Sequence, residues 1–132
     1  MSDDTPGNDI WTSIRSDRPA TPFASGCASR VVLDHVTSKW GVLVLASLAE
    51  RPRRWGELHR HVEGISEKML AQTLRALESD GFVLRDSHGT VPPRVDYSLT
   101  ALGEELAELL IPLVRWVGEN VGRTGVVLGA AS

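Results

Sequence analysis

The sequence of 132 residues contains a single cysteine and no long hydrophobic run. One cysteine, Cys27, excludes both an intramolecular disulfide and a cysteine-rich zinc site. The longest apolar stretch, residues 42–49 with one serine inside, is far shorter than the roughly 20 residues that span a bilayer. The first residues show no basic segment followed by an apolar one, so no secretory signal is visible. We therefore expect a cytoplasmic protein with no membrane contact.

Motifs of nucleotide binding and nucleophilic catalysis are also missing. The chain has no Walker loop, no Gly-x-Gly-x-x-Gly and no Gly-x-Ser-x-Gly sequence. Of its four histidines, His59 and His61 are two positions apart on a predicted helix and point in different directions. Glu104 and Glu105 open a predicted helix, where the helix dipole accounts for them. We expect no enzyme activity, no cofactor and no metal.

Length and composition indicate one ordinary globular domain, with 42% hydrophobic and 23% charged residues. The net charge of −3 does not by itself favour nucleic acid as a partner. The charges are segregated, however. Residues 51–75 carry six basic and three acidic side chains, whereas residues 100–122 carry one basic and four acidic ones. A basic region beside an acidic one keeps nucleic-acid binding open.

The stretch of residues 65–82, ISEKMLAQTLRALESDGF, predicts one helix with clear ends. Ser66 suits the N-cap, and Gly81 suits the left-handed position that ends a helix. Apolar residues recur every three or four positions, at Met69, Leu70, Leu74 and Leu77. The opposite face carries Lys68, Gln72, Arg75 and Ser79, whose side chains suit phosphate oxygens and base edges. An ordinary solvated surface would explain the same face.

Three further helices are expected before it. Residues 28–37 give the first, residues 38–49 give an almost wholly apolar and therefore central one, and residues 54–62 give the third. Two helices joined by a short turn with glycine, here Glu63 and Gly64, are typical of a helix-turn-helix. Residues 1–26 read as a flexible arm, with a short helix near residues 8–14 as a weaker expectation.

After Gly81 the hydrophobic period changes to two. Residues 82–85 and 94–99 are predicted strands of a hairpin, or wing, with turn residues between them. A long helix over residues 101–122 follows, and Pro112 inside it is expected to kink or divide it. Its apolar stripe is wider than one small core needs, which indicates a second copy as a partner. Residues 123–132 are expected to form a frayed tail.

The order of these elements is that of a winged helix-turn-helix, mainly α with a small β-hairpin. Particular motifs make the match closer: Ser38-Lys39-Trp40, Pro52-Arg53-Arg54-Trp55-Gly56-Glu57-Leu58, Gly64-Ile65-Ser66, Leu74-Arg75-Ala76-Leu77-Glu78-Ser79-Asp80-Gly81 and Val91-Pro92-Pro93-Arg94-Val95-Asp96-Tyr97-Ser98-Leu99-Thr100. From about Cys27 to Val117 the chain resembles the HxlR-type transcription regulators, bacterial relatives of the MarR group.

This resemblance implies a homodimer that binds a pseudo-palindromic DNA operator, with residues 27–100 as the DNA-binding domain and the terminal helix as the dimer interface. Carried onto this sequence, Lys68, Gln72 and Arg75 enter the major groove and Arg94 serves the wing. Ser66 is placed for a phosphate as well as for capping. Arg53 and Arg54 could reach the DNA backbone or belong to a solvated turn. The expected dimer residues are Leu106, Leu109, Leu110, Leu113 and Val117.

Cys27 is the remaining candidate site. Relatives of this type use a cysteine here to sense oxidants or electrophiles, and a thiol at a helix N-terminus gains thiolate character from the dipole. The family's usual Cys-Pro pair is Cys27-Ala28 here, and a small apolar plug explains the residue equally well. Two alternatives to simple DNA binding stay open. One is a winged helix that binds proteins, and the other is a regulator with a small-molecule effector between its DNA-binding domain and terminal helices.

Overall fold

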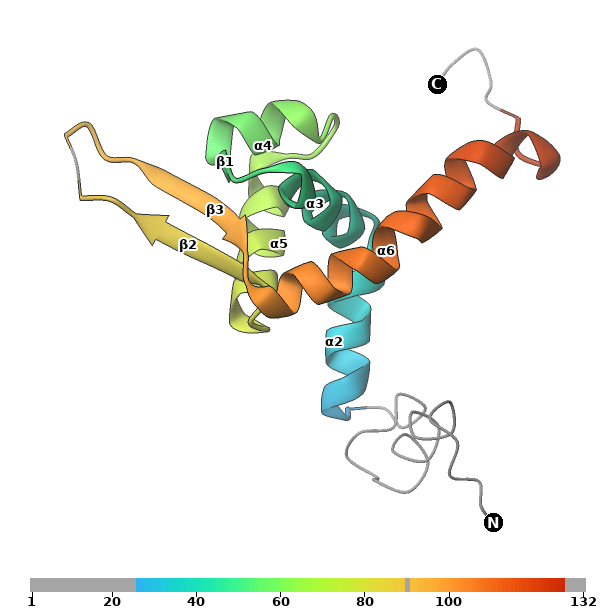
Figure 1. Ribbon diagram of the computed structural model, residues 1–132, viewed down its shortest axis with the longest axis horizontal. Helices are drawn as coiled ribbons and strands as arrows, with labels where there is room; N and C mark the ends of the chain where they lie inside the picture. Colours follow the sequence, from blue (N-terminus) through green and yellow to red (C-terminus); the bar gives the residue numbers. More distant parts are fainter. Residues whose placement is uncertain (1–25, 90, 128–132) are drawn as a thin grey trace.

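The computed structural model describes residues 26–89 and 91–127, so the predicted N-terminal arm and its short helix lie outside the described residues. The helices and strands, labelled as in Figure 1, follow in chain order: α2 (Ala28–Thr37), α3 (Lys39–Glu50), β1 (Arg53–Arg54), α4 (Trp55–His61), α5 (Glu67–Ser79), β2 (Val83–Ser87), β3 (Val95–Leu99), α6 (Ala101–Asn120) and η2 (Val121–Arg123). Within the described residues, the predicted helices and both predicted strands are present. This order confirms the winged helix-turn-helix.

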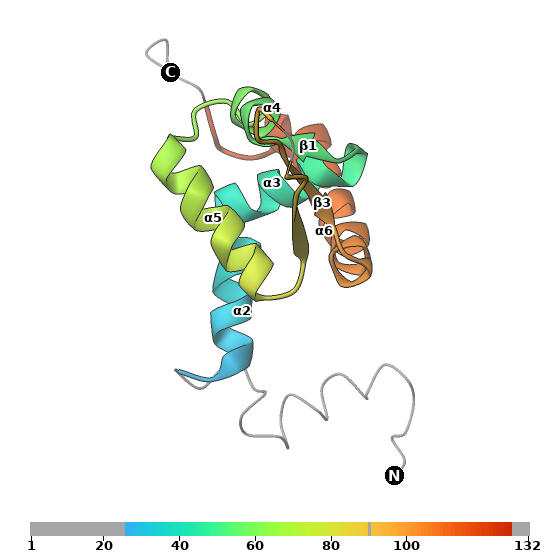
Figure 2. The same ribbon diagram turned by 90° about the vertical axis from the view of Figure 1, so that its left-hand side faces the viewer.

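The core forms around α3, as its apolar sequence predicts. Val44 and Leu45 of α3 are fully buried, together with Leu58 of α4 and Leu70 and Leu77 of α5. Figures 1 and 2 show α3 in the middle of the molecule, with α5 on one side and α6 on the other. The hairpin and the C-terminal half of α6 extend from the body in opposite directions (Figure 1). The core therefore fixes α5 in place and leaves the hairpin and α6 able to meet other molecules.

Hydroxyl side chains cap three of the helices at the predicted residues. Ser38, Ser66 and Thr100 each accept a backbone N–H bond of 3.0 Å from the residue three positions later. Such a bond satisfies one of the N–H groups that a helix start leaves without a partner. The hydroxyl of Thr100 also donates to the carbonyl of Gly81 at 2.6 Å, so the start of α6 is attached to the end of α5.

The end of α5 is fixed by two glycines. Gly81 has a φ of +93°, and the N–H of Phe82 donates to the carbonyl of Leu77 at 2.9 Å, which completes the turn that ends the helix. Gly103 lies against the backbone at Phe82, and a Cβ there would collide with the Phe82 carbonyl oxygen. This close approach lets α6 begin directly beside the end of α5.

The sheet has three antiparallel strands in the order β1-β3-β2. The hairpin strands pair Val83 with Leu99 and Asp86 with Asp96. The short strand β1, at Arg53 and Arg54, pairs with Tyr97 and Asp96 and was not predicted. Two residues are too few to show a period in the sequence, and their conformation depends on the hairpin that arrives later in the chain. β1 attaches the wing to the start of α4.

The last helix differs from the prediction in two ways. It continues through Pro112 as one helix, so of the two expected effects of this proline, a kink or a division, the division does not occur. Leu110, expected at a dimer interface, is only 8% exposed and packs in the core, and Leu106 is half-buried against that core. The reason is that the first part of α6 lies on the body of the molecule, so part of its wide apolar stripe is used within the chain.

Candidate nucleic-acid interface

The outer face of α5 is the centre of the candidate site. Lys68, Gln72 and Arg75 are all exposed, whereas Leu70, Leu74 and Leu77 are buried on the other face. Met69 was expected on the apolar face but remains 36% exposed at its edge. The helix thus presents an ammonium, a carboxamide and a guanidinium on one side, held by a core on the other.

The turn before α5 holds it against α4. Val62 and Ile65 on either side of the turn are buried, and Gly64 between them has a φ of +91°, which favours glycine. In addition, Nδ1 of His61 lies 2.6 Å from the hydroxyl of the buried Ser47 on α3. These contacts fix the two helices of the helix-turn-helix relative to α3.

The two neighbouring arginines at β1 have different positions. Arg53 is 7% exposed; its Nε donates to the carbonyl of Ser47 at 3.0 Å and its Nη2 to Oε1 of Glu50 at 2.6 Å. Arg53 was expected either to reach the DNA backbone or to lie in a solvated turn, and its position matches neither, because its guanidinium is used inside the protein. Arg54 is exposed and points from the same strand to the opposite face, next to Asp96.

The start of α4 carries a perturbed carboxylate. Oε1 of Glu57 accepts the backbone N–H of Arg54 at 2.9 Å, and Arg51 lies 3.6 Å from its Oε2. These interactions lower the pKa of Glu57 below its ordinary value of 4.5, with the backbone hydrogen bond as the largest cause. The ionised carboxylate stabilises the N-terminus of α4, beside the exposed Arg54.

The wing adds basic side chains to this surface. Arg94 is exposed, and its Nη2 lies 3.3 Å from Oδ2 of Asp96. Arg85 on β2 was not among the predicted site residues. It lines a hollow between α5 and the wing together with Arg75 and Glu78, so two arginines and one glutamate border the same recess. The alternation of the hairpin placed Arg85 on the face of Tyr97, a signal that the sequence already contained.

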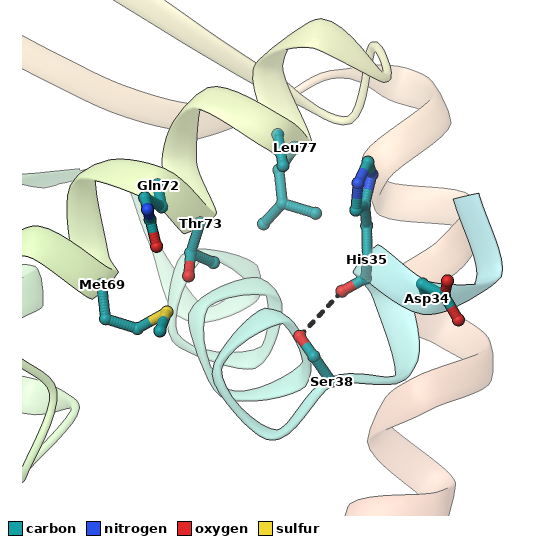
Figure 3. Close-up of a pocket in the computed structure, with 8 residues that line it drawn as sticks. Asp34, His35, Ser38, Met69, Gln72, Thr73 and Leu77 are labelled. Carbon is teal, nitrogen blue, oxygen red and sulfur yellow. Dashed lines mark hydrogen bonds between the residues drawn. The ribbon is translucent and has the colours of Figure 1, made fainter. Parts of the chain in front are cut away.

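A second hollow lies on the other side of α5, against α2 (Figure 3). Met69, Thr73 and Leu77 of α5, His35 of α2 and Ser38, the residue between α2 and α3, line it. At this boundary Nδ1 of His35 lies 2.7 Å from Oδ2 of Asp80, the residue that ends α5. The position of α5 therefore depends on α2 as well as on the core.

Cys27 is the N-cap of α2, where its Sγ accepts the backbone N–H of Arg30 at 3.3 Å. The thiol is partly buried. The predicted place at a helix N-terminus is confirmed, and the proline that usually follows is not needed to start the helix.

The C-terminal part of α6 exposes an apolar surface. Leu109 is 73% exposed, and Leu113 and Val117 are about half exposed. Trp116 is equally exposed and was missed, although it follows Leu113 by three positions and belongs to the same stripe. A separate hollow of about 500 Å³ lies between α3 and α6 and is lined by Ala46, Ala49, Glu50, Ile111, Val114 and Arg115.

Within the described residues, no group of three or more histidine, cysteine, aspartate or glutamate side chains is arranged to hold a metal ion. Among the same residues, no single helix is long and apolar enough to cross a membrane. Only α2 and α3 taken together have that length and apolar character, and the two are bent by 70° relative to each other.

The sequence matches the family model described as HxlR-like helix-turn-helix over residues 35–124. The uncharacterized HTH-type transcriptional regulator YtfH of Escherichia coli (strain K12) is 52% identical over 99 residues, which cover 75% of this chain and 79% of YtfH. Neither comparison points to an enzyme.

Solved structures of transcriptional regulators also resemble this chain. The YtfH protein of Salmonella typhimurium is 50% identical and superposes with a TM-score of 0.73 over 76% of this chain and 90% of its own. The redox regulator HypR in its oxidized form is 33% identical, with a TM-score of 0.66 over 71% of this chain and 97% of its own.

Proposed function

The chain belongs to the HxlR-like helix-turn-helix family of transcriptional regulators, and from this membership we propose that it binds a pseudo-palindromic DNA operator as a homodimer. It would act in the cytoplasm, where its DNA is. In this proposal α5 of each subunit enters the major groove, with Lys68, Gln72 and Arg75 toward the bases and phosphates.

The observation that carries the proposal is the two-sided character of α5. Its outer face exposes Lys68, Gln72 and Arg75 without an ion pair or side-chain hydrogen bond among the described residues, while its inner leucines are buried. A major groove admits a helix, and these side-chain types form its commonest base contacts. Arg54, Arg85 and Arg94 would contact the phosphates on either side, and Ser66 at the helix start would lie near one.

The apolar surface of α6 supports the homodimer. Leu109, Leu113, Trp116 and Val117 form an exposed stripe on a helix that leaves the body of the molecule. Monomers rarely leave a contiguous patch of this kind in water. A second copy would cover it, and the two α5 helices would then lie about 34 Å apart, one turn of DNA.

Selection of bound DNA from a random pool tests this function. We expect one enriched pseudo-palindrome with half-sites about 10 base pairs apart. Binding of every sequence with equal affinity would contradict operator recognition. Absence of binding even at low salt would favour the alternative, a winged helix that binds proteins. The net charge of −3 is consistent with that alternative.

A response to oxidants or electrophiles through Cys27 is a second part of the proposal. Its thiol lies at a helix N-terminus, and a relative of the same fold is a redox regulator. Since the chain has one cysteine, oxidation would join two subunits or capture an external thiol. The test compares DNA affinity of the parent and Cys27→Ser during titration with hypochlorite. Equal responses of the two proteins would exclude Cys27 as the sensor.

A small-molecule effector is the other possible signal. The hollow between α3 and α6 lies between the winged domain and the terminal helix and has the size of a ligand site. Ala49→Trp would fill it. An effector that releases the parent from DNA should then fail to release this variant. Equal release of the two proteins would exclude this hollow as the effector site.

A further inference from the structure

Three charged residues stand in one row across the wing. Asp86 on β2 is the direct partner of Asp96 on β3, and Arg54 on β1 is its partner on the other side. Two aspartates directly opposite each other destabilise an antiparallel pair unless other groups compensate their charge. The side chain of Asp96 is only 23% exposed, so its carboxylate depends on such groups more than a fully solvated one does.

Donors from three segments surround that carboxylate. Nε2 of His88 lies 2.8 Å from Oδ2 of Asp96, Nη2 of Arg94 lies 3.3 Å from the same oxygen, and Nε of Arg54 lies 3.9 Å from Oδ1. The hydrogen bond from His88 is the largest cause that holds the pKa of Asp96 below its ordinary value of 3.8; partial burial opposes it, and Arg94 adds to it. The carboxylate is therefore ionised and central to the group.

The backbone brings the same residues together. The N–H of His88 donates to the carbonyl of Arg94 at 2.9 Å, which extends the hairpin by one bond beyond the paired strands. His88 also lies 3.8 Å from Asp86, so an imidazolium here would face both aspartates. Around His88 the charged groups in the described part of the chain are thus Asp86 on β2, Asp96 on β3 and Arg94 before β3.

A carboxylate at this place would repel the phosphates of DNA, so its presence among cations needs a reason. Arginine side chains are long and flexible, and a carboxylate that binds one edge of a guanidinium fixes its direction. The remaining N–H groups stay available for a second acceptor. One carboxylate that lies beside two guanidinium groups and an imidazole can in this way align all three.

We propose that Asp96 is a positioning residue for DNA binding, which holds Arg54, His88 and Arg94 as one cationic surface of the wing for phosphates of the operator. This inference rests on the proposed function. Asp96 itself contacts no DNA.

The experiment compares two substitutions that remove the same charge, measured by fluorescence anisotropy with the selected operator. Asp86→Asn should bind as tightly as the parent or more tightly, because one repulsive charge is lost. Asp96→Asn should bind about tenfold more weakly in spite of the same change in charge, and Asp96→Glu should recover part of the loss. Equal tightening by the two asparagine variants would overturn the proposal, because Asp96 would then act only as a negative charge.

Thermal melts establish that each variant is folded at the assay temperature. If Asp96→Asn does not fold, Arg54→Gln and Arg94→Gln replace it, and each should reduce the salt slope of binding; unchanged slopes would overturn the proposal. If the parent binds no DNA at low salt, the proposed function fails as a whole. If the parent binds and Asp96→Asn equals Asp86→Asn, only the positioning role fails.

Discussion

Nδ1 of His35 lies 2.7 Å from Oδ2 of Asp80, and this contact joins α2 to the end of α5. The two residues are 45 positions apart in the sequence. Asp80 ends the helix that carries the candidate DNA contacts, and Cys27 begins the helix that carries His35. A change at α2 can therefore reach α5 through one polar contact and the hollow beside it.

The contact between His35 and Asp80 should contribute measurably to stability. We expect a double-mutant cycle of His35→Ala and Asp80→Ala to give a coupling energy of about 1 kcal/mol, reduced from that of a buried pair because the histidine side chain is one-third exposed. Urea denaturation provides the measurement. A coupling energy of zero would mean that the two side chains do not stabilise each other.

Arg53 and Arg54 should separate stability from DNA binding. Arg53→Ala should lower the free energy of unfolding by about 1–3 kcal/mol, since it leaves the Ser47 carbonyl without its donor, and should not change the salt slope of DNA binding. Arg54→Ala should leave stability nearly unchanged and reduce that slope by about one. The opposite assignment of the two effects would contradict the burial of Arg53.

Leu109 and Leu110 are neighbours on α6 with opposite exposure, so they separate assembly from folding. Leu109→Ser should leave the subunit folded and shift sedimentation toward the monomer. Leu110→Ala should instead lower the free energy of unfolding by about 2–5 kcal/mol, because it leaves a cavity in the core. A parent protein that sediments as a monomer at micromolar concentration would exclude the dimer.

Glu57 should make stability fall in mild acid. Its folded pKa lies below the ordinary value of 4.5, so its contribution is complete above pH 4.5 and disappears as pH falls through the lowered value. Glu57→Gln should be less stable than the parent near neutral pH, and the difference should shrink below pH 4.5. A difference that stays constant with pH would show that the ionised carboxylate contributes nothing.

Much of this fold could be predicted because its signals are local. The caps at Ser66 and Thr100, the glycine at position 81 and the apolar period of α5 each depend on a few neighbouring residues. Lys68, Gln72 and Arg75 could be assigned to an outer face for the same reason. Their exposure follows from helix geometry alone once the inner leucines are known.

The failures concern tertiary structure. Whether Arg53 points inward depends on β1 pairing with a hairpin more than 40 residues later, which no local pattern reveals. The apolar stripe of α6 is wider than the core of one subunit needs, as its sequence predicts. Its division between the core at Leu110 and the free surface at Leu109 depends on where α6 leaves the body. Trp116 could have been found by continuing the same period.

The most direct test of DNA recognition by α5 is the affinity of Arg75→Ala for the selected operator and for random DNA. Arg115→Ala, which removes an exposed arginine from α6, is the matched control. If Arg75 contacts a base, the variant should lose about 1–3 kcal/mol of operator binding and much of its preference over random DNA, while Arg115→Ala changes neither. Unchanged operator affinity in a folded Arg75→Ala, and likewise in Lys68→Ala, would contradict the insertion of α5 into the groove.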